Sequence, residues 1–292
     1  MTGPRPSRWS LIGTGVVVEF EFEIRKPGPP LEPFAESIWF ARGRITYSRE
    51  RIAPTGSTVA VLVLGPAILQ VPRNGAGVPF LAERGWLAGP HVGPVINAPT
   101  AETLAVGIVS SAVGCRALFG VGPAPLRGRV VDLMENWAAA GSLRAALLGE
   151  SDPFACLDMT EETLVLGLGP AENGWQRCAA AVAALEENPL RRISELAHEL
   201  GVTHAHLDRE FVRTVGLTPR ALSRILRLRR LLESIDIHAE LNWADLATAW
   251  GWFDQSHFIR DFKRHTGVTP SGYVAAQRAV FAQHEPGFVP EM

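Results

Sequence analysis

The stretch GWFDQSHFIRDFKRHTGVTP, residues 251–270, combines residue types that bind DNA with a spacing that is typical of a helix. Phe258 and Phe262 are four residues apart, so on a helix they share one face. Arg260 and Lys263 then lie outside that apolar stripe. Arginine, glutamine and histidine donors suit base edges, whereas lysine suits phosphate. The pattern fits either a core helix with one solvent-exposed side or a helix that enters a DNA groove.

The same pattern occurs twice along the chain. Residues 196–219 (LAHELGVTHAHLDREFVRTVGLTP) align with residues 246–270 (LATAWGWFDQSHFIRDFKRHTGVTP) at an offset of about fifty. Each copy predicts a short apolar helix, a tight turn at Gly201 or Gly251, and a second helix. That is the order of a helix-turn-helix, and the second turn is one residue longer. A purely structural helix pair would not need the same polar outer face twice.

The second helix of each copy should present its polar side to DNA. Leu207 and Phe211 in the first copy must face the core, as Phe258 and Phe262 do in the second. The outward faces carry these candidate DNA-binding residues: His204, His206, Arg209 and Arg213 in the first copy, and Gln255, His257, Arg260 and Lys263 in the second. Arg213 and Arg264 fit phosphate contacts no better than they fit solvation or pairing with acidic neighbours.

A long helix should join the two copies. Thr218 and Pro219 form a good N-cap and first-turn pair, as Thr203 and Asp254 are N-caps of the two outward-facing helices. The helix that follows, PRALSRILRLRRLLESI, would be about 25 Å long at 1.5 Å per residue. Two recognition helices at its ends can fall in successive major grooves, roughly 34 Å apart.

The region from Trp175 to Arg278 resembles the double helix-turn-helix domain of the AraC/XylS-type transcription regulators. Two positions depart from the family pattern: Trp252 stands where Phe or Tyr is usual, and Val274 where Arg is usual. The resemblance rests on these residues of the second copy: Gly251, Phe253, Asp254, Ser256, Phe258, Arg260, Phe262, Lys263, Gly267, Thr269, Pro270 and Tyr273.

The resemblance implies a transcription regulator whose partners are double-stranded DNA and RNA polymerase. By position it implies phosphate binding by Lys263 and by the backbone near the helix starts, around Thr203 and Ser256. It implies base contacts from these residues: Ala205, Asp208, Arg209, Gln255, His257 and Arg260.

Several residues have simpler interpretations than a direct function. Trp243, Trp250 and Trp252 are expected to pack rather than to stack on bases, because duplex readers leave bases paired. His204 and His206 are two residues apart on a helix and point in different directions, which argues against zinc. We expect neither a bound metal nor a cofactor.

The first part of the chain reads as β structure. Residues 14–24 (TGVVVEFEFEI) alternate apolar and polar side chains, as a half-buried strand does. VAVLVL (59–64), AILQV (67–71) and LAVGIV (104–109) are short apolar runs bounded by Gly or Pro, typical of buried strands. From Val130 on, VVDLMENW and GSLRAALLGE predict a small helical appendage, while residues 164–168 fit helix or strand. We therefore expect an α+β chain: a β-rich, cupin-like or jelly-roll-like domain, then an all-α domain.

The predicted domains are residues 1–172, residues 173–284 and a tail at 285–292. Residues 104–149 resemble an uncharacterised N-terminal domain of similar regulators, which implies a sensor or a dimerisation module without choosing between them. Trp39, Phe40, Phe80 and Trp86 are weak candidates for lining a small-molecule pocket, because aromatic residues near Gly-rich loops often line pockets but more often form core. We expect control by a small-molecule effector bound to the first domain; the alternative is a first domain that only dimerises, as a homodimer, or binds a protein partner.

Composition sets the remaining bounds. The 292 residues, 47% hydrophobic, suffice for two domains, and no apolar run approaches the roughly 20 residues of a membrane span. Without an export pattern at the N-terminus, we expect a cytoplasmic protein. Cys115, Cys156 and Cys178 are too far apart for a metal cluster and are expected to be buried bystanders. His91 is the one histidine before Trp175, so a histidine-rich catalytic metal centre is excluded there, and we expect no enzyme.

Overall fold

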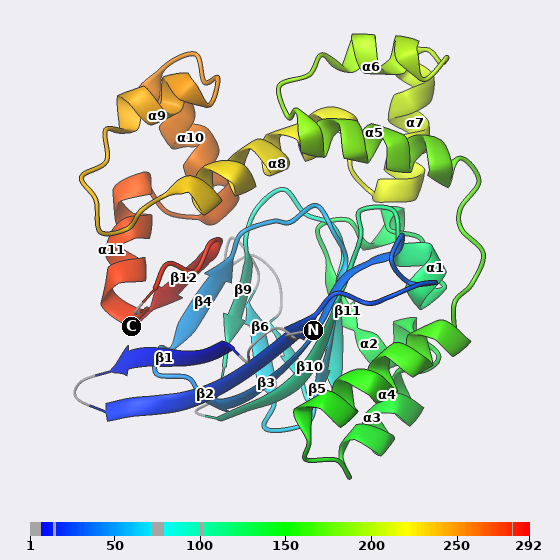
Figure 1. Cartoon of the computed structure of the whole chain (residues 1–292), viewed down its shortest axis with the longest axis vertical. Coiled ribbons are helices and arrows are strands. Elements are labelled where there is room, and N and C mark those ends of the chain that lie inside the picture. Colours follow the sequence, from blue (N-terminus) through cyan, green and yellow to red (C-terminus); the bar gives the residue numbers. More distant parts are fainter. Residues whose placement is uncertain (1–6, 14–15, 72–78, 100–101, 282) are drawn as a thin grey trace, which may run out of the picture.

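The computed structural model describes residues 7–13, 16–71, 79–99, 102–281 and 283–292. Two antiparallel sheets form one half of the molecule, and helices form an arch over one end of them (Figure 1). Within the described residues, no helix is long and apolar enough to cross a membrane. The predicted order, a β-rich part followed by a helical part, is confirmed.

The larger sheet has seven strands, and each strand pairs antiparallel with its neighbours. Its strand order across the sheet is β1 (Ser7–Gly13), β2 (Val16–Arg25), β3 (Ala35–Arg44), β10 (Glu102–Ser110), β5 (Val59–Val63), β8 (Gly85–Ala88) and β11 (Val130–Asp132). Strands β2, β5 and β10 lie where the alternating and apolar runs predict them. Central β5 and β10 are buried on both faces, which explains why their sequences are apolar without alternation.

The smaller sheet has five strands and faces the larger one. Its order is β12 (Phe288–Glu291), β4 (Arg49–Ile52), β9 (Val95–Ala98), β6 (Ile68–Val71) and β7 (Phe80–Ala82). Ile68 and Ala82 of this sheet pack with Val61, Val63 and Trp86 of the larger sheet in one cluster. That cluster is the interior of a β-sandwich, and the apolar runs at 59–64 and 67–71 supply strands to its two different sheets.

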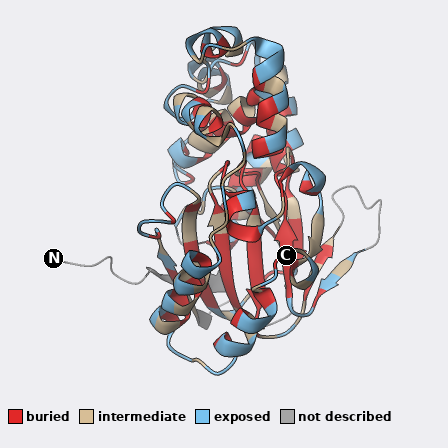
Figure 2. Ribbon diagram, turned by 90° about the vertical axis from the view of Figure 1, so that its right-hand side faces the viewer, coloured by how far each residue is buried: buried red, intermediate tan, exposed pale blue. Residues whose placement is uncertain are grey.

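Helices cover the outer face of the larger sheet. They are α1 (Cys115–Phe119), the 3-10 helix η1 (Ala124–Leu126), α2 (Leu133–Asn136), α3 (Ala140–Leu147) and α4 (Pro153–Leu166). Phe40, Leu62 and Val106 from the sheet pack with Leu143 and Leu157 from these helices. The central strands are largely buried, as Figure 2 shows. The predicted helical appendage therefore forms a hydrophobic core with the outer face of the larger sheet, separate from the core between the two sheets.

Two predictions in this region are corrected or settled. Val130–Asp132 was predicted to be helical, but it pairs with β8 as strand β11, because three apolar-rich residues cannot reveal their period. The side chain of Asp132 then caps α2 by accepting from Met134 N at 2.7 Å. Residues 164–166 end helix α4 rather than forming a strand.

The helical part contains seven helices among the described residues. They are α5 (Trp175–Glu187), α6 (Ile193–Glu199), α7 (His204–Val215), α8 (Pro219–Ser234), α9 (Trp243–Ala249), α10 (Gln255–Thr266) and α11 (Pro270–Val280). The predicted N-caps of α7, α8 and α10 are confirmed, since Thr203, Thr218 and Asp254 each accept a hydrogen bond from a first-turn amide. The linking helix α8 has 16 residues, close to the predicted length.

The last residues of the chain were predicted to form a tail, but the structure gives them a place in the β-sandwich. Phe288–Glu291 pairs with β4 as strand β12, so the end of the helical part joins the sheet of the first part. Pro290 is tolerated because β12 is an edge strand of its sheet. Val289 is 1% exposed and packs in the core of α8 to α11. A segment that is too short and polar to read as a strand thus bridges the two parts.

Candidate nucleic-acid interface

The first unit consists of α5, α6 and α7. Leu207 and Phe211 are fully buried, as their four-residue spacing predicts. The turn between α6 and α7 contains Gly201 at φ +69°, a backbone conformation that glycine adopts without strain, and closes with Val202 N donating to Ala197 O at 3.0 Å. The turn therefore sets the angle between α6 and the recognition helix α7.

The second unit, α8 to α10, repeats this construction with aromatic residues. Phe258 and Phe262 are fully buried and form an edge-to-face pair whose ring centroids are 5.7 Å apart. Gly251 has φ +77°, and Trp252 N donates to Ala247 O at 2.8 Å. The prediction that the tryptophans pack is confirmed: Trp243, Trp250 and Trp252 all lie in this core.

In each unit, an arginine of the first helix pairs with an acidic residue of the third helix, and neither pair was predicted from the sequence. In the first unit, Arg177 of α5 donates to both carboxylate oxygens of Glu210, at 2.8 and 3.0 Å. In the second, Arg227 of α8 donates to Asp261 at 3.1 Å and lies over the ring of Trp252, 3.9 Å from its centroid.

These pairs occupy equivalent positions, so the repeat covers three helices in each unit. The two arginines are fifty residues apart and the two acids fifty-one, with the extra residue in the second turn. Both acids are nearly buried, at 7% exposure. The two acids lie within the segments that align by their apolar residues, 196–219 and 246–270, whereas the two arginines lie outside them, which is why the pairing was missed.

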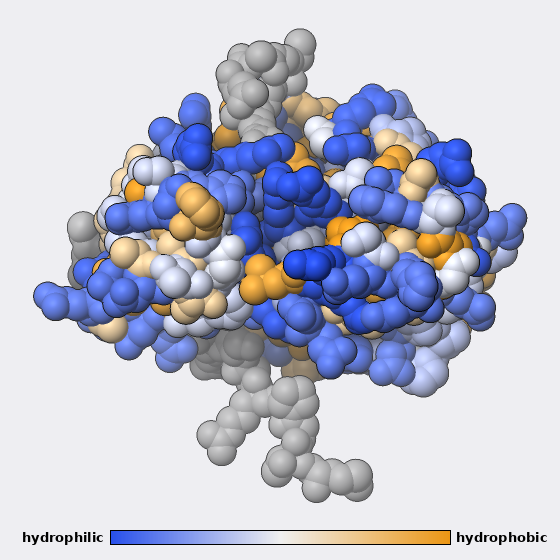
Figure 3. Space-filling model, turned by 90° about the horizontal axis from the view of Figure 1, so that it is seen from above, coloured by the Kyte–Doolittle hydropathy of each residue, from blue (hydrophilic) through white to orange (hydrophobic). Residues whose placement is uncertain are grey.

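The predicted DNA-contacting residues lie at the surface. Asp208 and His257 are half-buried. The others are exposed: Thr203, His204, Ala205, His206, Arg209 and Arg213 in the first unit, and Gln255, Ser256, Arg260, Lys263 and Arg264 in the second. Seen from the side of the helices, the surface is mostly hydrophilic with scattered apolar side chains (Figure 3).

The two recognition helices point their N-terminal ends away from the sheets and rest their C-terminal ends on the β part (Figure 1). A Cβ atom on Gly216, after α7, would lie 2.6 Å from Pro90, and one on Gly267, after α10, would lie 3.4 Å from Pro94. His265 Nδ1 is 2.5 Å from the carbonyl oxygen of Val92, to which it donates. One loop, residues 89–94, therefore contacts both recognition helices.

Arg213 differs from the other predicted contacts because it is engaged within the chain. Its guanidinium donates to Asn173 O at 2.8 Å and lies within 3.6 Å of Glu172 and 3.9 Å of Glu210. Arg209 and Lys263, in contrast, form no ion pair with any described residue. Arg209 and Lys263 can therefore meet a ligand without breaking an ion pair to any described residue.

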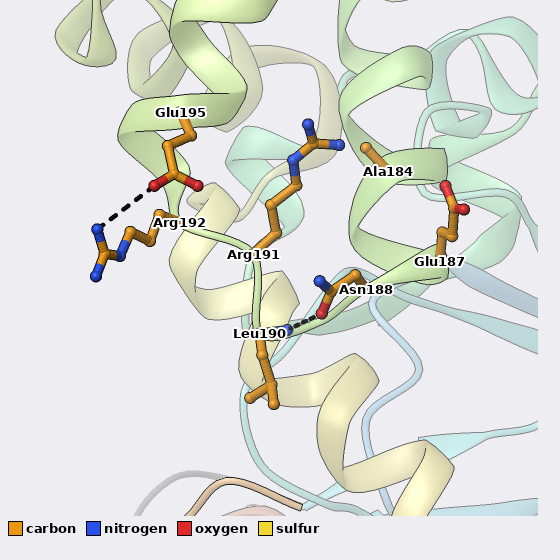
Figure 4. A pocket seen from close by; sticks show the side chains of 7 residues that line it. All are labelled: Ala184, Glu187, Asn188, Leu190, Arg191, Arg192 and Glu195. Carbon is orange, nitrogen blue, oxygen red and sulfur yellow. Dashed lines mark hydrogen bonds and ion pairs between the residues drawn. The ribbon is translucent and has the colours of Figure 1, made fainter.

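A shallow pocket lies between α5 and α6, close to both units. Arg191 extends between the two helices, whereas Arg192 points outward to Glu195 at 3.5 Å (Figure 4). Leu190, also at the pocket, packs on the turn of the second unit, where a Cβ on Gly251 would be 3.0 Å from its methyl carbon. This loop holds the two units together beside the recognition helices.

The predicted pocket residues of the β part do not form one group. Trp39, Phe80 and Trp86 pack in the interior between the sheets. Phe40 belongs to the opposite face of the larger sheet, under the helices, because consecutive residues of a strand point to opposite faces. Phe40 is therefore separated from the other three by the sheet itself.

A row of polar side chains crosses the smaller sheet, and two of its members, Asn97 and Gln70, are buried. Glu50, Asn97 and Gln70 are cross-strand neighbours on β4, β9 and β6. Glu50 accepts hydrogen bonds from Asn97 Nδ2 at 2.9 Å and from the Tyr47 hydroxyl at 2.7 Å, and burial raises the pKa of its carboxyl group. Neither amide atom of Gln70, which is 3% exposed, has a hydrogen-bond partner among the described residues.

This row faces the interior of the sandwich. Gln70 lies on the same side of β6 as Ile68, which belongs to the interior cluster. From the larger sheet, Thr103 of β10 lies on the same side as Ala105 of that cluster, and its hydroxyl also has no partner among the described residues. A buried polar group without a partner costs free energy, so each one calls for an explanation.

Comparisons with known proteins agree with this construction. A family model described as a helix-turn-helix domain matches residues 196–276. The chain is 33% identical over 91 residues to the probable transcription factor PqrA of Proteus vulgaris, covering 30% of this chain and 72% of the relative.

Solved structures that match the chain include ToxT of Vibrio cholerae, at 12% identity and a TM-score of 0.46, with 88% of this chain and 98% of ToxT covered. The C-terminal domain of AraT from Geobacillus stearothermophilus matches 34% of this chain and 84% of its own length, at 21% identity and a TM-score of 0.31. From the paired helix-turn-helix units and the match to the transcription factor, the chain belongs to the AraC/XylS-type transcription regulators.

Proposed function

We propose that this regulator reads one DNA duplex with both units at once, the N-terminal turns of α7 and α10 entering two successive major-groove segments. The observation that carries this proposal is that both turns are exposed, at opposite ends of α8 and on the side away from the sheets. The 16 residues of α8 span about 24 Å, which keeps adjacent grooves, roughly 34 Å apart, within reach of the two units.

Arg209 and Arg260 occupy equivalent positions and are proposed to read base edges, together with His206 and His257. Lys263 is proposed to bind phosphate, as are the helix starts around Thr203 and Ser256, where the first-turn backbone amides attract anions. The proposed set is completed by His204, Ala205, Asp208 and Gln255 at the base edges and by Arg213 and Arg264 near phosphate.

The β-sandwich is proposed to bind a small-molecule effector. The support is the polar row in its interior, where Gln70 and Thr103 hold hydrogen-bonding atoms that the described chain does not satisfy. A module that served dimerisation alone would have no use for such groups in its interior. Trp39, Phe80 and Trp86 would form the apolar part of this site.

Effector binding would reach the DNA-binding units through two direct contacts. The polar row includes Glu50 on β4, the strand that pairs with β12. It also includes Asn97 on β9, which follows directly on the loop 89–94 that contacts both recognition helices. A ligand that binds one arrangement of these strands more tightly shifts the DNA affinity by that difference.

The alternative is a regulator whose first domain only dimerises or binds a protein.

We propose domain boundaries at residues 172 and 284, action in the cytoplasm with RNA polymerase as a partner, and no catalytic step. Homodimerisation is compatible with either alternative.

The test has two parts. Duplexes selected by the full-length protein from a randomised pool should bind more tightly than scrambled duplexes. A metabolite screen by thermal shift should then find a ligand that stabilises the protein and changes its affinity for the selected duplex. A ligand effect that is unchanged in Gln70→Leu would contradict the interior site, and a chain that no metabolite stabilises would favour the alternative.

A further inference from the structure

The second unit is one residue longer than the first, and the extra residue is Phe253. The hydrogen bond that closes each turn is the same, from Val202 N in the first unit and from Trp252 N in the second. The N-cap of α7, Thr203, follows Val202 directly. In the second unit Phe253 stands between Trp252 and the N-cap of α10.

Phe253 has no packing role in the second unit. Its side chain is 93% exposed, more than any other large hydrophobic side chain among the described residues. An apolar residue before an N-cap often packs on the fourth helical residue, which here is Phe258. Trp252 fills that place instead, with its ring 5.1 Å from the ring of Phe258 and 4% of its surface exposed.

Phe253 lies at the N-terminal end of recognition helix α10, and this is the end that would reach the bases. Exposed residues Asp254, Gln255 and Ser256 follow it directly. N-terminal residues of a recognition helix are those that contact base edges in the major groove. The thymine methyl group is the apolar feature of that groove, and phenylalanine is among the side chains that contact it.

We propose that Phe253 packs on a thymine methyl group and selects a T·A pair within the segment that α10 reads. The inference rests on the proposed DNA-reading function. It assigns to the second unit an apolar contact for which the first unit has no counterpart, so the two halves of the operator should differ in this requirement.

The test uses the full-length protein and a duplex that it has selected from a randomised pool. Each thymine under the second unit is replaced in turn by deoxyuridine, which removes only the methyl group. At one position this should weaken binding of the wild type about three- to fivefold, the value of one buried methyl group. Phe253→Ala should lose a similar factor on the thymine duplex and be indifferent to deoxyuridine there.

The matched control is Leu166→Ala, which removes an 82% exposed side chain at the end of α4 and should leave affinity unchanged. Both variants are exposed and should keep the melting temperature of the wild type. Equal deoxyuridine penalties in the wild type and in Phe253→Ala would overturn the inference, as would a selected segment without a required thymine. A wild type that selects no sequence at all would instead overturn the DNA-reading function on which the inference rests.

Discussion

At the scale of single residues, the proposed function assigns base reading to Arg260 and phosphate binding to Lys263 on the same helix. Arg260 is exposed, and its Nε donates to Ser256 O of the same helix at 3.3 Å. We expect Arg260→Ala to cost about 1 to 3 kcal/mol on the selected duplex and to relax the preference for one base pair. Titration of the variant against duplexes mutated at single positions measures both effects.

Lys263 supplies the matched comparison on the same helix. We expect Lys263→Ala to weaken all sequences alike and to reduce the slope of log affinity against log salt by about one. Salt titrations on the selected and the scrambled duplex give that slope. If both variants lost equal affinity on both duplexes, the division of roles between arginine and lysine would be wrong.

Gln70 supplies a residue-scale test of the interior site. Because neither of its amide atoms has a partner among the described residues, we expect Gln70→Leu to stabilise the ligand-free protein by about 1 to 2 kcal/mol. The free energy of unfolding in urea measures this. The neighbouring Asn97→Leu is the control, since it breaks the hydrogen bond to Glu50 and should destabilise the protein. Destabilisation by Gln70→Leu would show that its polar atoms are satisfied.

At the scale of elements, each unit depends on an ion pair that joins its first and third helices. The side chains of Arg227 and Asp261 are only 12% and 10% exposed. Removing one partner leaves the other charge buried, although the Trp252 indole still donates to Asp261 at 3.2 Å. We therefore expect Arg227→Met to lower the free energy of unfolding by about 2 to 4 kcal/mol.

The double variant Arg227→Met with Asp261→Leu removes both charges and should cost less than the sum of the single changes. Denaturant unfolding of the four proteins provides the cycle. Additive losses would mean that the pair contributes no coupling, and that packing alone holds α8 against α10.

Strand β12 should respond to pH through Glu285. Burial raises the pKa of this carboxyl group from 4.5 to about 8. Between these values the folded chain keeps a proton that the unfolded chain has lost, so stability falls as the pH rises through that window. Burial lowers the pKa of the neighbouring His284, which acts in the opposite sense below its ordinary value of 6.5.

The clean window for Glu285 is therefore pH 6.5 to 8. We expect the wild type to lose stability there relative to Glu285→Gln, whose amide resembles the protonated acid. Thermal unfolding at several pH values, together with hydrogen exchange of the β12 amides, measures the difference. A constant difference across the window would contradict a titrating Glu285.

The elements that were predictable from the sequence are those whose signals are local. The caps Thr203, Thr218 and Asp254 and the paired phenylalanines each specify a helix within a few residues. Strands β11 and β12 were not predictable, because three or four residues carry no period and their partners β8 and β4 lie far away in sequence. The opposite faces taken by Trp39 and Phe40 follow from alternation, but only once the strand is known.

At the scale of the whole molecule, the β part holds both units in one relative pose. Loop 89–94 contacts the C-terminal ends of both recognition helices, while Arg229 of α8 donates to Thr55 O at 3.2 Å. Phe34 and Trp175 pack across the boundary with ring centroids 5.3 Å apart. These contacts leave the N-terminal ends of α7 and α10 free. The β part therefore holds the two helices in the arrangement in which they would meet DNA.

The most direct test of two units on one duplex is a hydroxyl-radical footprint of the full-length protein on its selected duplex. We expect two protected segments on one face of the DNA, their centres about one helical turn, or 10 base pairs, apart. Arg209→Ala should weaken protection of one segment and Arg260→Ala that of the other. A single protected segment, or protection no stronger than on scrambled DNA, would contradict the account.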